Sequence, residues 1–98
     1  MSVTISVKNG NISETLKEYA QNKAAKLIED FPRITTVTIV LDMQKTRSKA
    51  EIIVRAKQTD IEADAETYDM YESVDTIIEK AYAQLKKQHD KITEHRKA

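Results

Sequence analysis

The fold is decided by the stretch VTIVLDMQKTRSKAEIIVRAKQTDIEADAE, residues 37–66. Apolar and polar residues alternate along three segments of this stretch, and a period of two is typical of strands with one buried face. Polar residues separate the segments at 44–49, where we expect a loop, and at 58–60, where we expect a tight turn. Three consecutive strands are therefore predicted. Their inward-facing residues are Val37, Ile39, Leu41, Met43, Ala50, Ile52, Val54, Ala56, Ile61, Ala63 and Ala65.

A strand and a helix are predicted before this stretch. Residues 3–7 alternate in the same way, and the turn formers at 9–11 follow them. Ser13 is a typical helix N-cap, and apolar residues then recur at spacings of three and four, which predicts an amphipathic helix over 14–29. Pro32 ends this helix. The apolar positions are Leu16, Ala20, Ala24, Leu27 and Phe31.

A second helix is predicted after the stretch, from Met70 to about Ile92, with fraying from about residue 93. Asp69 is its expected N-cap, and Glu72 stands at the capping-box spacing. Its apolar stripe comprises Val74, Ile78, Ala81, Leu85 and Ile92. The order β-α-β-β-β-α predicts an α+β fold, a two-layer sandwich in which a four-stranded, mostly antiparallel sheet carries two helices on one face. The first helix forms a right-handed crossover if the first two strands pair in parallel.

Length and composition limit the possible functions. The 98 residues favour a single domain over 1–98, and the absence of cysteine excludes a disulfide framework and a thiolate nucleophile. Neither a secretory signal nor a membrane-spanning apolar stretch is recognisable. The chain has 16 basic and 16 acidic residues. A surface that binds nucleic acid therefore requires that these charges are segregated in space.

The second predicted helix has a basic edge and an acidic edge. Lys80, Lys87 and Lys91 cluster on one side of the apolar stripe, whereas Lys86 lies among acidic residues and is expected to pair with Asp90. The first helix carries Lys23 and Lys26 beside its apolar face. If the helices lie side by side, the basic edges form one strip for phosphate groups, which the residues His89, His95, Arg96 and Lys97 extend. An ordinary solvated lysine surface explains the same pattern, and the sequence leaves both interpretations open.

Other candidate residues also have two interpretations. Lys45, Arg47 and Lys49 lie in or beside the predicted loop, where they serve as phosphate contacts or only as solubilising charges. Three tyrosines, Tyr68, Tyr71 and Tyr82, suit stacking on bases, but tyrosines around a helix start more often pack against the sheet, and we favour packing.

No catalytic or metal-binding constellation is recognisable. His89 and His95 are six residues apart on different helix faces, which makes a poor metal pair. No Gly-x-Ser-x-Gly elbow is present, and a single glycine excludes the common nucleotide-binding loops. We therefore expect neither an enzyme nor a bound metal or cofactor.

The second predicted helix resembles the closing helix of the hibernation-promoting factor and ribosome-associated inhibitor family. Its most recognisable signature is DMYESVD at 69–75, followed by IEK at 78–80 and QLKK at 84–87. The first helix, with ISETLKEY at 12–19, is also similar to that of the family. The resemblance extends from Val3 to about Lys91.

This resemblance implies a fold like a double-stranded-RNA-binding domain with an added strand. It further implies a cytoplasmic stress and stationary-phase factor of the short, hibernation-promoting type. Such a factor binds ribosomal RNA in the mRNA and tRNA channel (A and P sites) of the small ribosomal subunit, inhibits translation, and preserves or dimerises idle ribosomes. The implied partners are the small subunit and a separate ribosome modulation factor, and no association with a membrane is implied. The resemblance also implies that the protein is a monomer when it is not bound to the ribosome.

Carried over by position, the resemblance also implies the residues that contact ribosomal RNA. The main ones are Lys23, Lys26, Lys80, Lys87 and Lys91, and the secondary ones are Lys86, His89, Lys45, Arg47 and Lys49. Asp69 and Tyr71 match the motif but are expected to serve the fold, as cap and packing residue. The alternative function is a protein-interaction domain on the same scaffold, using the acidic fourth strand or the sheet face, because the net charge is zero.

Overall fold

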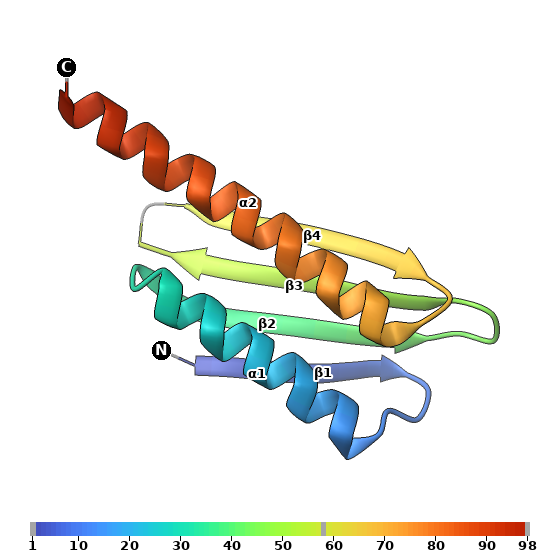
Figure 1. Ribbon diagram of the computed structural model, residues 1–98. Helices are drawn as coiled ribbons and strands as arrows, with labels where there is room; N and C mark the ends of the chain where they lie inside the picture. Colours follow the sequence, from blue (N-terminus) through green and yellow to red (C-terminus); the bar gives the residue numbers. More distant parts are fainter. Residues whose placement is uncertain (1, 58, 98) are drawn as a thin grey trace.

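The computed structural model describes residues 2–57 and 59–97, with side chains described as far as residue 88. Both helices cover the same face of one sheet (Figure 1). The order of elements is β1 (Ser2–Asn9), α1 (Glu14–Asp30), β2 (Ile34–Met43), β3 (Ser48–Ala56), β4 (Asp60–Thr67) and α2 (Met70–Lys97). The predicted α+β class and the order β-α-β-β-β-α are confirmed.

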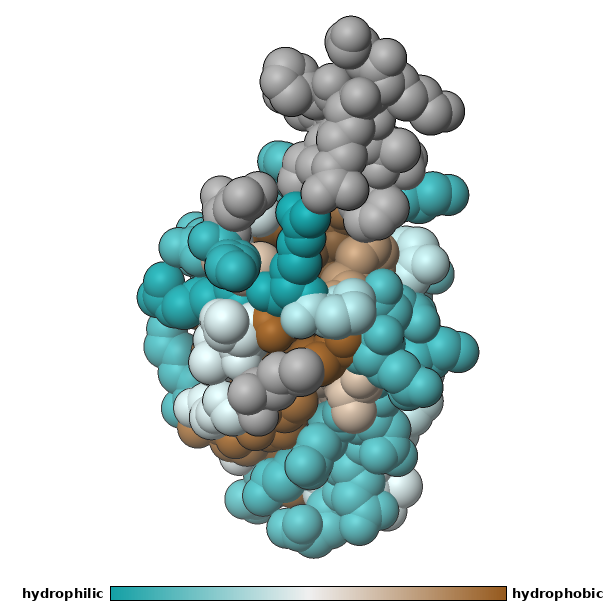
Figure 2. All heavy atoms as spheres, turned by 90° about the vertical axis from the view of Figure 1, so that its left-hand side faces the viewer, coloured by the Kyte–Doolittle hydropathy of each residue, from teal (hydrophilic) through white to brown (hydrophobic). Residues whose placement is uncertain are grey.

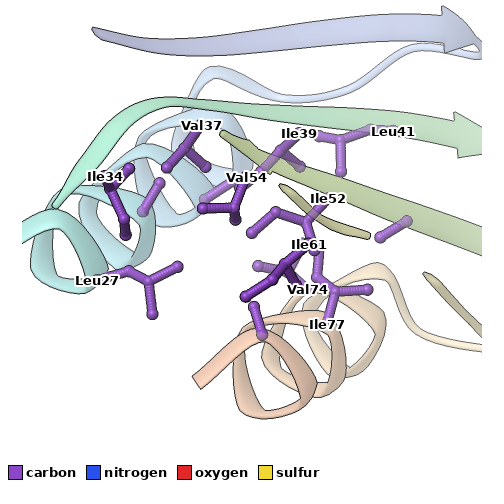
Figure 3. Close-up of a cluster of buried hydrophobic side chains, with 14 of the residues drawn as sticks. Leu27, Ile34, Val37, Ile39, Leu41, Ile52, Val54, Ile61, Val74 and Ile77 are labelled. Carbon is purple, nitrogen blue, oxygen red and sulfur yellow. The ribbon is translucent and has the colours of Figure 1, made fainter. Parts of the chain in front are cut away.

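The four strands lie in the order β1-β2-β3-β4. β1 pairs with β2 in parallel, so α1 forms the predicted crossover, and the other two pairings are antiparallel. The register places Ile39 opposite Ile52, and Val54 opposite both Val37 and Ile61. These side chains point toward the helices and form the core shown in Figure 3. Figure 2, which views one end of the domain, shows hydrophobic residues gathered between hydrophilic ones.

The connection between β2 and β3 is shorter than predicted. The Gln44 backbone N–H donates to the Arg47 carbonyl at 2.8 Å, which closes a hairpin at 44–47. Lys49 is therefore not a loop residue, because it lies in β3 opposite Asp42 and Glu66. The reason is tertiary: the buried Ser73 hydroxyl on α2 donates to the Ser48 carbonyl at 2.6 Å and holds the start of β3 against the helix. In the turn predicted at 58–60, Gln58 lies outside the described residues and Asp60 belongs to β4.

Both predicted helix N-caps are confirmed. The Ser13 hydroxyl accepts from the Leu16 N–H at 3.2 Å, and the Asp69 carboxylate accepts from the Tyr71 N–H at 3.2 Å. The Glu72 part of the predicted capping box is wrong, because the Asp69 N–H donates instead to the Thr67 hydroxyl at 3.1 Å. Gly10 has φ +88°, and an added Cβ would lie 2.9 Å from the Met43 carbonyl oxygen, so this turn requires glycine.

The apolar stripe of α2 differs from the predicted one at a single decisive position. Ile77 is fully buried with Val74 and Ala81, whereas Ile78 is only partly buried and lies beside α1. The physical reason is that α2 packs on β3 and β4 while α1 occupies the space on its other side. Helical periodicity alone does not distinguish adjacent isoleucines at the border of a stripe. The predicted member Ile92 lies outside the described side chains.

Replacing the two isoleucines one at a time tests this assignment. We expect Ile77→Ala to lower the free energy of unfolding by about 2–5 kcal/mol, because it leaves a cavity in the closed core. Ile78→Ala removes the same atoms from a partly solvated position and is expected to have a clearly smaller effect. Urea denaturation of both variants provides the measurement, and equal losses would contradict the described rotation of α2.

Candidate nucleic-acid interface

The sheet face that carries no helix is rich in acidic side chains. Because Ile61 is buried toward the helices, the alternating residues of β4 point to the opposite side, which we call the open face. Acidic residues there outnumber the basic Lys49 and Arg55, and Arg55 is paired with Asp60 at 3.2 Å. The acidic residues are Asp42, Glu51, Asp60, Glu62, Asp64 and Glu66. A polyanion is repelled by such a face.

One edge of α2 lies over β4, the edge strand of the sheet. The Lys80 ammonium donates to the Asp64 carbonyl at 2.8 Å, and the Gln84 amide donates to the Glu62 carbonyl at 3.4 Å. These side chains cover backbone acceptors of the edge strand, which would otherwise be free to pair with another strand. A carbonyl is neutral, so Lys80 keeps its charge, and two of its three ammonium donors remain for a ligand. Lys87 stands two turns further along this edge, and we call these two residues the outer lysine row.

A groove runs between the two helices on the other side of α2. It has a volume of about 480 Å³, and we call it the interhelical groove. Lys23 and Lys26 of α1 line it together with Lys86 of α2, over an apolar floor that includes Ile78 and Tyr82. Asp30 and Glu79 also line it, so carboxylates lie among the ammonium groups.

The expectation of one strip formed by the two basic helix edges is wrong. The outer lysine row faces away from α1, and Lys86, which the sequence placed among acidic residues, joins Lys23 and Lys26 instead. The cause is the burial of Ile77, which turns the Lys80 edge of α2 toward β4. The positive charges of the helix layer therefore form two groups, one on each side of α2.

The motif at 69–75 joins the two helices. The Tyr19 hydroxyl of α1 donates to the Asp75 carboxylate at 2.5 Å, and the Tyr19 and Tyr71 rings meet edge to face with centroids 5.0 Å apart. The Lys23 ammonium lies 5.4 Å from the centroid of the Tyr19 ring. The expected structural roles of Asp69 and Tyr71 are confirmed. The role of Asp75 was missed, although its position one turn after Tyr71 places both on one side of the helix.

The hydrogen bond to Asp75 raises the pKa of Tyr19 above 10.0, and burial and the negative charge of Asp75 add to this effect. All three causes favour the neutral phenol, because the ionised form loses its donor proton and faces a carboxylate. The contact between the helices therefore depends on a protonated tyrosine.

The other tyrosines divide into two kinds. Tyr71 and Tyr82 do pack, but against α1 and its end rather than against the sheet as predicted, since Tyr71 meets Tyr19 and the Tyr82 ring meets Phe31 edge to face at 5.1 Å. Tyr68 is different, because it remains 79% exposed and the Arg47 guanidinium lies 5.2 Å from its ring centroid. Arg47 and Lys45 project from the hairpin at 44–47 and line a cleft of about 440 Å³ between this hairpin and the start of α2. We call this cleft the hairpin cleft.

Several predicted contacts lie outside the described side chains. These are His89, Lys91, His95, Arg96 and Lys97, together with the expected pairing of Lys86 with Asp90. Within the part of the chain that the structure describes, no group of three side chains is arranged to hold a metal ion. No helix among the described residues combines the length and apolarity that crossing a membrane requires.

Known proteins resemble this chain over nearly its whole length. Residues 3–93 match the family model described as Sigma 54 modulation protein / S30EA ribosomal protein. The ribosome hibernation promoting factor of Escherichia coli (strain K12) is 36% identical over 95 residues, which cover 97% of this chain and 100% of that protein. The factor of the same name from Azotobacter vinelandii is 31% identical over 94 residues, which cover 96% and 88%.

Two solved structures share the fold. A ribosomal subunit interface protein from Coxiella burnetii superposes with a TM-score of 0.83 at 26% identity, covering 92% of this chain and 99% of that one. The N-terminal domain of Thermus thermophilus Protein Y superposes with a TM-score of 0.78 at 21% identity, covering 89% and 98%. At this lower identity the likeness concerns the fold alone.

The pKa of Tyr19 predicts a specific dependence of stability on pH. Tyr19→Phe loses the bond to Asp75, so the wild type is more stable while the phenol is protonated. That advantage is fully present below a pH of about 10, the ordinary pKa of tyrosine, and is lost as the pH rises through the raised pKa of the folded state. Denaturant unfolding of both proteins between pH 8 and pH 11 measures the difference. Tyr68→Phe is the matched control, and a Tyr19 difference that stays constant over this range would contradict the assignment.

Proposed function

Because this chain belongs to the Sigma 54 modulation protein / S30EA ribosomal protein family, we propose that it is a ribosome hibernation factor. It binds the ribosomal RNA of the small subunit in the channel that otherwise holds messenger RNA and the A- and P-site transfer RNAs. Translation is blocked because these ligands are excluded, and the idle ribosome is preserved or joined into a dimer. Relatives with hibernation in their names that align along 97% of this chain support the proposal.

The helix layer is the surface that meets RNA. The observation that carries this assignment is a difference in charge between the two faces, since acidic residues dominate the open face, whereas the helices carry acidic and basic residues in equal numbers and place lysines on both sides of α2. Phosphate contacts account for most of the affinity of a protein for nucleic acid. A chain with no net charge therefore binds RNA only in the orientation that turns its open face away.

Two groups of lysines take the phosphate contacts. The outer lysine row consists of Lys80 and Lys87, about 10 Å apart along the helix axis, and Lys91 continues the same spacing in the sequence. Lys23, Lys26 and Lys86 form the second group in the interhelical groove. Lys45, Arg47 and His89 are proposed as secondary contacts. Lys49 is the weakest member of the set, because it lies on the open face between Asp42 and Glu66.

The proposed action is stoichiometric occlusion and involves no chemical step. We propose that residues 1–98 act as a single ribosome-binding domain in the cytoplasm, without a metal or cofactor. The chain is a monomer off the ribosome and acts beside a separate modulation factor when ribosomes dimerise.

Charge reversal on the helix layer tests the proposed surface. We expect Lys80→Glu with Lys87→Glu to abolish cosedimentation with small ribosomal subunits, and Lys23→Glu with Lys26→Glu to weaken it strongly. The thermal unfolding midpoint is expected to fall only modestly, because the contacts that are lost, from Lys80 to the Asp64 carbonyl and from Lys23 to the Tyr19 ring, lie at the surface and not in the core. In milder Lys→Gln variants, each removed phosphate contact lowers the slope of log affinity against log salt by about 1.

A matched charge reversal at Lys8, near the end of β1, and Lys57, directly after β3, is the control and is expected to leave binding largely intact. Equal losses in all double variants would indicate a general charge effect and contradict the assigned surface. Unimpaired binding by both helix variants would favour the alternative, a protein-interaction domain that uses the acidic open face. In that case, binding to a protein partner survives nuclease treatment and Glu62→Lys on the open face disrupts it.

A further inference from the structure

Tyr68 is the exception among the four tyrosines of this chain. The Tyr19, Tyr71 and Tyr82 rings each pack against another aromatic ring, whereas 79% of Tyr68 faces solvent. Tyr68 lies in the short connection between β4 and α2, where it lines the hairpin cleft. Core packing therefore does not account for a large aromatic side chain at this position.

The guanidinium of Arg47 lies beside the Tyr68 ring. The Cζ atom of Arg47 lies 5.2 Å from the centroid of the Tyr68 ring, and the Nε atom of Arg47 lies 3.7 Å from the Glu66 carboxylate on β4. The two residues come from different connections of the fold, since Arg47 ends the hairpin at 44–47 and Tyr68 follows β4. Because Glu66 belongs to the open face, this half-exposed ion pair lies at the border between that face and the hairpin cleft. The result is an exposed aromatic surface next to a positioned guanidinium.

The hairpin cleft beside this pair has a composition suited to one nucleotide. Leu16, Met43 and Met70 supply apolar lining, and Asn11 and Gln44 add amide groups that are able to pair with the edge of a base. Lys45 lies on the hairpin and supplies a positive charge for a phosphate. Ser13 and Asp69 also line the cleft, but both already cap helices, so the remaining polar contacts come from the other side chains.

We propose that Tyr68 and Arg47 form a stacking platform for an unpaired nucleobase of RNA, with the adjoining phosphate on Lys45. Aromatic rings and guanidinium planes are the groups on which proteins stack unpaired bases, and every base offers a face for this contact. The platform rests on the proposed function, because the RNA it serves is that of the small subunit. It adds to the lysine contacts a recognition of single-stranded RNA that phosphate binding alone does not provide.

The position of Tyr68 relative to the outer lysine row is compatible with one RNA strand that contacts both. Tyr68 precedes α2 by two residues, and Lys80 lies on the same helix about 15 Å further along its axis. A single RNA strand that contacts the outer lysine row is therefore within a few nucleotides of the hairpin cleft. We expect the unpaired base to lie at the end of the domain where α2 begins.

The absence of tryptophan from the chain allows a direct optical test. Tyr68→Trp introduces a single indole at the platform, and Ile53→Trp introduces one in the control on the open face, away from both lysine groups and the hairpin cleft. We expect single-stranded 12-nucleotide oligoadenylate at low salt to quench the Tyr68→Trp fluorescence strongly. A duplex RNA of equal length is expected to quench it weakly, and neither RNA is expected to quench the Ile53→Trp fluorescence.

Affinity for purified small subunits supplies the second measurement. We expect Tyr68→Ala to weaken binding by about tenfold, and Tyr68→Phe to keep affinity within about twofold because the ring remains. Arg47→Lys keeps the charge but loses the planar surface, so it is expected to weaken binding as well. The salt dependence of Tyr68→Ala is expected to match that of the wild type, because a ring releases no counterions. Its thermal unfolding midpoint reports whether the fold is intact.

The outcomes separate the platform from the proposed function. If wild type and Tyr68→Ala bind small subunits equally, and oligoadenylate leaves the Tyr68→Trp fluorescence unchanged, the platform is refuted while the hibernation function stands. If the wild type fails to bind small subunits, the proposed function is refuted, and the quenching experiment still decides whether the cleft accepts an unpaired nucleotide. Equal quenching by single strand and duplex would also overturn the proposal, because the faces of bases inside a duplex are covered by the neighbouring base pairs.

Discussion

The rotation of α2 about its own axis is the constraint on which the surface of this domain depends. Burial of Ile77 with Val74 and Ala81 turns one edge of the helix toward β4, and the bond from Tyr19 to Asp75 ties the opposite edge to α1. A helix held from both sides has one orientation. The described lysines of α2 then separate, with Lys80 and Lys87 in the outer lysine row and Lys86 in the interhelical groove.

Zero net charge is compatible with RNA binding because the two layers carry different surfaces. The strand period of two sends carboxylates of β4 to the open face, while the helices present lysines on the opposite side of the sheet. The lysine surface is still mixed, since Asp30 and Glu79 lie in the interhelical groove. Such mixing lowers the affinity for a uniform polyanion, so binding depends more on a match between the positions of the phosphates and those of the lysines.

Several polar side chains serve the fold and remain available to a ligand. Lys80 covers a carbonyl of the edge strand yet keeps its charge, because its acceptor is neutral. Arg47 is paired with Glu66 and still presents its plane beside Tyr68. In both cases the structural contact limits the side chain to one region, so less conformational entropy is lost when RNA binds.

The sequence by itself determined the order of elements, the four strands, both N-caps and the family motif, because each depends on neighbours within a few residues. Alternation fixed which strand residues face the core, and DMYESVD at 69–75 identified the closing helix. Only the tertiary structure decided that Ile77 rather than Ile78 is buried, that Lys49 belongs to β3, that Lys86 joins Lys23 and Lys26, and that Tyr68 stays exposed. These outcomes depend on contacts between segments that are distant in the chain, and local periodicity contains no information about which neighbour each side of a helix will meet.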